Sequence, residues 1–89
     1  MVYNEQFMYY VYILLLSNKK LYTGFTTNIS RRIKEHKQGK SPFTKSYLPL
    51  KLIFYEVFNN KIDAKKRERY FKTSKGKSSL RAMLKNTFN

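Results

Sequence analysis

The chain has 89 residues, which predicts a single domain over residues 1–89 with its core at about 8–85. It carries 19 Lys and Arg against 5 Asp and Glu, a formal net charge of +14. Such an excess favours a polyanionic partner but does not specify a fold, and the alternative is a basic surface that only maintains solubility. With no cysteine, disulfides and thiolate metal sites are excluded.

The longest apolar run, residues 11–16, is far shorter than the ~20 residues that cross a bilayer. The first ten residues also lack the basic region, hydrophobic stretch and cleavage site of a secretory signal. We therefore expect a cytoplasmic protein with no membrane partner and no small-molecule cofactor.

Residues 9–16 are rich in aromatic, β-branched and leucine residues, which favours a strand. Polar residues 17–20 interrupt this run, and residues 21–23 resume it before Gly24 ends it, which predicts a two-stranded hairpin. A helix should follow, with Asn28 as its N-cap and Gly39 at its end. This helix carries Arg31, Arg32 and His36.

Residues 39–49 have the composition of a loop in which basic residues alternate with aromatic ones. Lysines such as Lys40 and Lys45 can meet phosphates, while the rings of Phe43 and Tyr47 can meet bases. The alternative is that these rings fold back onto the core.

Residues 50–58 predict a third strand, and apolar residues on both of its faces indicate a central position in the sheet. A helix over about 61–73, a break at Ser74-Lys75-Gly76 and a last helix over about 77–86 complete the chain. The order is β-β-α-β-α-α. This predicts an α+β domain with a small, mainly antiparallel three-stranded sheet flanked by helices.

Glu68 shares one face of the 61–73 helix with Ala64 and Phe71. A carboxylate in the middle of an inward apolar stripe is costly unless it meets a cation or a metal. The alternative is a surface glutamate paired with a basic residue of its own helix, namely Arg67, Arg69 or Lys72.

Arg32 borders the inward face of the first helix, which is formed by Ile29, Ile33 and His36, while Arg31 points about 100° away. Arg32 can therefore aim its planar fork at a phosphate above the sheet, or else extend from the rim into solvent. His36 is the side chain that titrates nearest neutrality when unperturbed, although a lone helical histidine is also often structural.

Tyr12 and Tyr22 lie on the same face of the hairpin only if the connecting loop has an odd length. A loop of three or five residues around residues 17–20 satisfies this condition, and a strict four-residue loop does not. Otherwise the two are ordinary core tyrosines.

The ordered set Tyr10-Val11-Tyr12, Tyr22-Thr23-Gly24 and Arg32, ten residues after Tyr22, resembles the GIY-YIG endonucleases. The resemblance is closest to small single-domain members, which are similar to the nuclease portion of the bacterial excision-repair C subunit. It covers residues 8–85. Tyr10 stands in place of the first motif's glycine and Thr23 in place of the second motif's isoleucine.

The resemblance implies metal-dependent hydrolysis of DNA phosphodiester bonds, in DNA repair or recombination. It implies that Glu68 binds Mg²⁺ or Mn²⁺ and that Arg32 binds the scissile phosphate. By the same resemblance, one of Tyr12 and Tyr22 would orient or deprotonate the attacking water, and the other would donate a hydrogen bond to a phosphate oxygen. His36 matches the Arg-x-x-x-His spacing of small members.

Three further residues, Arg31, Thr44 and Lys45, are expected to contact the nucleic acid. Glu56 is the second candidate for the metal ligand. Two other functions remain open at this point: a non-catalytic basic nucleic-acid-binding module, and a domain whose basic face binds an acidic protein.

Overall fold

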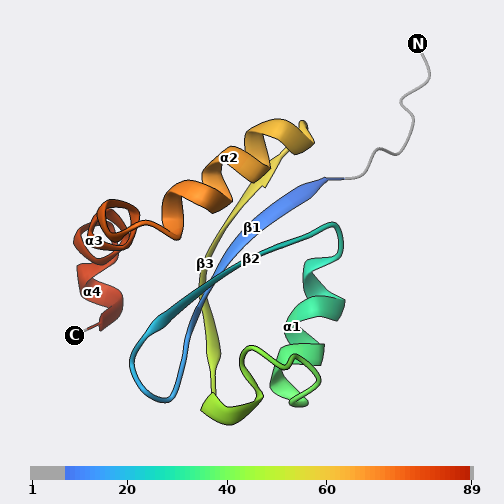
Figure 1. Ribbon diagram of the computed structural model, residues 1–89, viewed down its shortest axis with the longest axis vertical. Helices are drawn as coiled ribbons and strands as arrows, with labels where there is room; N and C mark the ends of the chain where they lie inside the picture. The colour runs from blue at the N-terminus through green and yellow to red at the C-terminus, as the bar shows by residue number, and fades with distance from the viewer. Residues whose placement is uncertain (1–7, 89) are drawn as a thin grey trace.

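The computed structural model describes residues 8–88 and confirms the α+β architecture and the order of elements. Strands β1 (Tyr9–Leu15), β2 (Leu21–Thr26) and β3 (Lys51–Phe58) form an antiparallel sheet in the order β2-β1-β3. Helix α1 (Ile29–Lys37) lies on one face, and α2 (Lys61–Phe71), α3 (Ser74–Met83) and α4 (Lys85–Phe88) lie on the other (Figure 1). None of the helices within residues 8–88 is long and apolar enough to cross a membrane.

The hairpin register places both motif tyrosines on the face that α1 covers. Leu15 pairs with Leu21, so the loop contains five residues, 16–20, and meets the odd-length condition. Tyr12 pairs with Gly24, and Leu14 pairs with Tyr22. Strand β2 continues through Gly24 to Thr26, so the prediction that Gly24 ends the strand was wrong.

The central strand is β1, and the prediction of a central third strand was wrong because β3 is an edge strand. Residues 11–14 of β1 are at most 1% exposed, as expected for a strand covered on both faces. On β3, by contrast, Tyr55 is 49% and Val57 43% exposed. Apolar composition on both faces of β3 was misleading because α1 leaves part of one sheet face uncovered.

Each face of the sheet has its own core. On the α1 face, Tyr12, Leu14 and Leu16 pack with Ile33 and Leu50. On the α2 face, Val11 and Ile13 pack with a second set of buried residues, Leu21, Ala64, Phe71 and Leu80. The sheet thus separates two helical layers, and the α1 layer contains the motif tyrosines.

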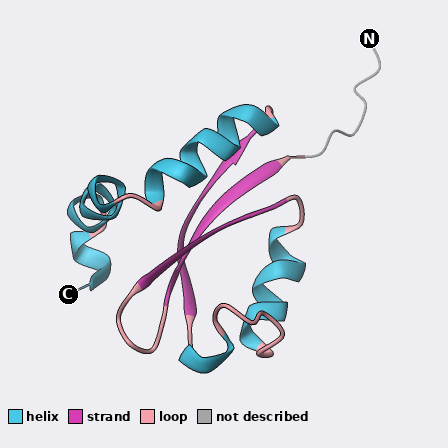
Figure 2. Cartoon of the chain, in the orientation of Figure 1, coloured by secondary structure: helices cyan, strands magenta, loops and turns pink. Residues whose placement is uncertain are grey.

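The ends of α1 match the sequence. The Asn28 side chain accepts a hydrogen bond from the Arg31 amide, and Gly39 follows the helix with φ +76°. The connection from α1 to β3 is mostly loop, interrupted by the 3₁₀ helix Lys45–Tyr47 (Figure 2). Within this segment the backbone amides of Thr44 and Lys45 donate to the Ser41 carbonyl, and the Thr44 side chain contacts His36 of α1.

The predicted break at residues 74–76 was wrong: these residues form the first turn of α3. The chain turns at Lys72 and Thr73 instead, and the Thr73 hydroxyl caps α3 by accepting from the Gly76 amide at 3.0 Å. A side chain at Gly76 would overlap the Tyr70 carbonyl of α2. The glycine therefore permits a close approach between two helices rather than breaking one.

Candidate active site

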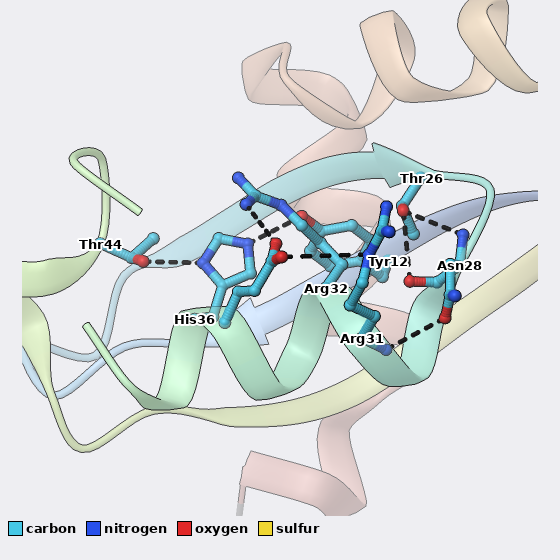
Figure 3. A network of polar contacts seen from close by, with 8 residues as sticks. Tyr12, Thr26, Asn28, Arg31, Arg32, His36 and Thr44 are labelled. Atoms are coloured by element: carbon cyan, nitrogen blue, oxygen red, sulfur yellow. Dashed lines mark hydrogen bonds and ion pairs between the residues drawn. The ribbon is translucent and has the colours of Figure 1, made fainter. Parts of the chain in front are cut away.

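A buried hydrogen-bonded chain joins β1, α1 and the loop after α1. The Tyr12 hydroxyl lies 2.8 Å from Nε2 of His36, and Nδ1 of the same ring lies 2.8 Å from Oγ1 of Thr44. Figure 3 shows the His36 ring between these two hydroxyls. His36 and Thr44 are fully buried, and Tyr12 is 1% exposed. The imidazole orientation is therefore fixed at both nitrogens.

His36 is neutral at physiological pH. Burial, reinforced by the positive charge of Arg32, lowers the pKa of His36 to about 4, while Glu35 acts in the opposite direction. A neutral imidazole has one N–H donor and one acceptor nitrogen. Because each ring nitrogen faces a hydroxyl that can donate or accept, both tautomers satisfy the ring.

Arg32 completes the group on the side of Tyr12. Its Nη1 donates to Oε1 of Glu35 at 3.1 Å, and its side chain is 31% exposed. Burial acts to lower the pKa of the Arg32 guanidinium, but its interactions with Tyr12 and Glu35 outweigh burial and raise that pKa. Arg32 is therefore permanently charged, interacts with the Tyr12 hydroxyl and remains accessible to solvent.

Tyr12 is a protonated phenol in this environment. Burial raises the pKa of Tyr12 to about 12; Arg32 opposes the increase, whereas Tyr22 and the charge of Glu68 add to it. Tyr12 therefore enters any reaction as an O–H donor whose oxygen can accept a second hydrogen bond.

Tyr22 packs against the same histidine. The centroids of the Tyr22 and His36 rings are 5.4 Å apart, and those of Tyr12 and His36 are 5.6 Å apart, both in edge-on geometry. The structure thus brings together five residues, here called the tyrosine group: Tyr12, Tyr22, Arg32, His36 and Thr44. The family resemblance assigned all of them except Thr44 to the chemistry.

Glu68 lies on the inward face of α2, as predicted, together with Ala64 and Phe71. Its two carboxylate oxygens contact Lys65 Nζ at 3.1 Å and Lys72 Nζ at 2.9 Å. Burial acts to raise the pKa of Glu68, but hydrogen bonds from the two lysines outweigh burial and lower it. The carboxylate is therefore ionised. Since α2 and α1 are on opposite faces of the sheet, Glu68 influences the tyrosine group through its charge on Tyr12 rather than by a direct hydrogen bond.

A divalent cation at Glu68 would have few protein ligands. Within residues 8–88, no group of three or more His, Cys, Asp or Glu side chains comes together. Mg²⁺, however, often uses one or two protein carboxylates and fills its shell with water and substrate phosphate. Glu68 is ionised and largely buried, and its lysine partners are 44% and 55% exposed side chains that can move away.

The second candidate carboxylate is already engaged. Both oxygens of Glu56 accept from the Arg67 guanidinium, at 2.8 and 3.2 Å. Such a bidentate pair is geometrically well matched and leaves Glu56 poorly available to a metal. The structure therefore favours Glu68 over Glu56 as the carboxylate that could bind one.

The three residues expected to contact nucleic acid have different surroundings. Arg31 is exposed and makes a long contact of 3.9 Å to Glu35, and Lys45 is exposed at the start of the 3₁₀ helix. Thr44 is fully buried against His36, so in this structure its hydroxyl positions the imidazole and does not face solvent.

Two partners in the site escaped the sequence analysis. Glu35 binds Arg32, and the spacing from Arg32 to Glu35 could have revealed it, because residues i and i+3 of a helix are neighbours. The contact between Thr44 and His36 depends on how the loop folds back, and no local sequence signal predicts it.

Comparisons with known proteins identify the family of this chain. A profile of the GIY-YIG catalytic domain matches residues 8–82. The UPF0213 protein CPE1444 of Clostridium perfringens is 46% identical over 66 residues, which are 73% of this chain and 71% of that protein. The UPF0213 protein SAG0778 of Streptococcus agalactiae is 40% identical over 80% of this chain and 82% of its own length.

A solved structure is also similar. The solution NMR structure of the UPF0213 protein BH0048 from Bacillus halodurans matches with a TM-score of 0.57 and 34% identity. The match covers 85% of this chain and 84% of that one. Together with the tyrosine, arginine and histidine arrangement, these matches show that the chain belongs to the GIY-YIG catalytic domain family.

Proposed function

We propose that the protein is a metal-dependent endonuclease that hydrolyses phosphodiester bonds in DNA and serves DNA repair or recombination. The observation that carries the chemical proposal is the 2.8 Å contact between the Tyr12 hydroxyl and Nε2 of a neutral histidine, next to a partly exposed arginine. This combination supplies a proton acceptor and a phosphate-binding cation in one group.

The proton path starts at the attacking water. The relay uses the tautomer with its proton on Nδ1: the water donates to the Tyr12 oxygen, Tyr12 passes its own proton to Nε2 of His36, and Nδ1–H donates to Thr44 throughout. A direct phenolate base is disfavoured at neutral pH, because the pKa of Tyr12 is about 12. A relay avoids a free phenolate, since Tyr12 gains one proton as it gives up another.

Arg32 links binding to this relay. Its charge helps to keep the pKa of His36 at about 4, which opposes protonation of the ring. A phosphate bound to Arg32 would offset that charge and make His36 a better proton acceptor when substrate is present. The same guanidinium would stabilise the negative charge that develops on the phosphate during attack, and Tyr22 would bind another phosphate oxygen.

When bound at Glu68, Mg²⁺ or Mn²⁺ would supply Lewis-acid stabilisation of the developing charge. The protein contributes an ionised, largely buried carboxylate for this purpose. Lys65 and Lys72 keep that carboxylate charged before the cation arrives.

The charge distribution supports a nucleic-acid substrate. The ion pairs within residues 8–88 use five basic residues, Arg31, Arg32, Lys65, Arg67 and Lys72. The remaining lysines and arginines of that part of the chain have no carboxylate partner in these pairs. Unpaired cations of this kind bind phosphate by releasing counterions.

A second candidate function, a non-catalytic DNA-binding module, is favoured by one observation. The two lysines that hold Glu68 already neutralise it without a metal. Incubation of the purified protein with supercoiled plasmid, in Mg²⁺, in Mn²⁺ and in EDTA, separates the two functions. The endonuclease nicks the plasmid in the presence of either metal and not in EDTA; a binding module shifts the plasmid in a gel but never nicks it.

A further inference from the structure

A hollow lies between α1 and the edge strand β3, on the side of α1 away from the Arg32 guanidinium. It has a volume of about 600 Å³. Ile29 and Ile33 of α1 and Leu52 of β3 line it, together with the ring of Tyr55, which is 49% exposed. This is an apolar groove with an aromatic wall.

The rim of the groove is basic and polar. Lys34 and Lys37 line it from the last turns of α1, next to the side chains of Ser30 and Gln38. Neither lysine takes part in an ion pair within residues 8–88, because Glu35, the one acidic residue of α1, is held by Arg31 and Arg32. An occupant with a flat apolar body and negative charge at its edge matches these walls.

Some residues of α1 line the groove, and others belong to the tyrosine group. Ile29, Ile33 and Lys37 face the groove, whereas Arg32 and His36 belong to the tyrosine group. A helix with its side chains is about 10–12 Å across. The two sites therefore lie about one helix width apart, a distance that a few nucleotides of one strand span.

We propose that this groove binds an unpaired nucleotide of the DNA substrate, a few positions from the bond to be cut. The proposal rests on the proposed function and adds a substrate class: DNA with a single-stranded stretch beside the cut. In a continuous duplex the faces of the bases are covered by their neighbours and only their edges are open. A groove lined by isoleucine, leucine and a tyrosine ring meets a base only after that base has left the stack.

The test measures binding without cleavage. A fluorescent 12-nucleotide single strand, the same strand with abasic sites, and its blunt duplex are each titrated with the protein in EDTA. We expect Tyr55→Ala to weaken binding of the intact single strand about tenfold, the order of one base–aromatic stack. Tyr55→Phe, which keeps the ring, should bind as the wild type does. Binding of the duplex and of the abasic strand should not change in either variant.

Val57→Ala is the matched control, because Val57 is 43% exposed, follows Tyr55 by two residues on the same face of β3, and does not line the groove. This variant should bind all three probes like the wild type. An equal loss on single strand and duplex in Tyr55→Ala, or no loss at all, would overturn the proposal. A monomer–dimer equilibrium that disappears in Tyr55→Ala would also overturn it, by showing that a second copy covers the groove.

The outcome is distinguishable from that of the proposed function. If the protein never nicks plasmid but binds single strands in a manner that depends on Tyr55, the endonuclease proposal is wrong and the nucleotide-binding groove is supported. If the protein cleaves DNA but Tyr55→Ala does not change single-strand binding, the endonuclease proposal is supported and the nucleotide-binding groove is wrong.

Discussion

The ring of Tyr12 lies over its register partner Gly24, so closely that a Cβ atom at position 24 would overlap the phenol ring and its hydroxyl. Gly24 is the last residue of the second motif triplet, and Tyr12 is the last of the first. The absence of a side chain on β2 is therefore what lets the Tyr12 hydroxyl reach His36. The glycine acts by close approach, within a continuous strand.

Gly24→Ala should displace the Tyr12 ring. We expect a loss of about 1–3 kcal/mol in the free energy of unfolding from overpacking, and a fall in nicking of at least a hundredfold. Thermal melting and plasmid nicking at 25 °C measure the two effects. Gly39→Ala is the control, because the strain at φ +76° lowers stability by about 1–2 kcal/mol without touching the tyrosine group. Equal nicking by these two variants at a temperature where both are folded would refute this role for Gly24.

Stability should decrease in mild acid because of His36. Its pKa is about 4 in the folded protein, below the ordinary value of ~6.5, so the unfolded chain binds the proton more readily. The stabilisation is complete above pH ~6.5 and is lost as the pH falls toward 4, by up to about 3 kcal/mol. The lowered pKa of Glu68 acts in the same direction at lower pH.

Urea unfolding at several pH values between 7 and 4 measures this loss. His36→Gln is less stable at pH 7 because it loses the imidazole contacts, but its stability should change much less over the same range. If the variant and the wild type show the same dependence on pH, His36 is not the group responsible.

Arg32 and Arg31 form a matched pair of neighbouring arginines. Arg32→Ala should reduce nicking by at least two to three orders of magnitude at matched DNA occupancy, because Arg32 is the cation beside Tyr12. Arg31→Ala should weaken binding mildly and retain chemistry, since its side chain is 71% exposed. Single-turnover cleavage at saturating protein measures both, and comparable losses in the two variants would contradict this assignment.

DNA affinity should depend steeply on salt. A protein that neutralises six or more phosphates loses about a thousandfold or more between 50 and 200 mM salt. Fluorescence anisotropy with a labelled duplex over that range tests this expectation. A nearly flat response would instead favour an acidic protein partner for the basic surface.

Much of the fold followed from local sequence. Two β-rich runs separated by a polar segment predicted the hairpin, and Asn28 and Gly39 marked both ends of α1. The strand order did not follow, because Tyr55 and Val57 are apolar whether or not another element covers them. Gly76 was misinterpreted as a helix break for a similar reason: a glycine that permits close packing has the same sequence signal as one that ends a helix.

The candidate site was predictable to the extent that periodicity determines it. The odd loop length places Tyr12 and Tyr22 on the sheet face that α1 covers. Helical spacing places Arg32 and His36 on the side of α1 that faces these tyrosines. The contact of Thr44 with His36 and the pairing of Glu56 with Arg67 each join two different elements, a loop to α1 and β3 to α2. Such contacts exist only once the chain has folded.

The central claim, a catalytic carboxylate in an endonuclease, is tested most directly by the single-turnover cleavage rate of Glu68→Gln in Mg²⁺ at saturating protein. The amide keeps the shape but removes the charge that Mg²⁺ prefers. Loss of a metal's contribution costs several kcal/mol, so the rate should fall by at least a hundred- to thousandfold while DNA binding is retained. Glu56→Gln, measured in parallel, should lose stability through Arg67 but still cleave DNA. A Glu68→Gln variant that cleaves at nearly the wild-type rate would contradict the account.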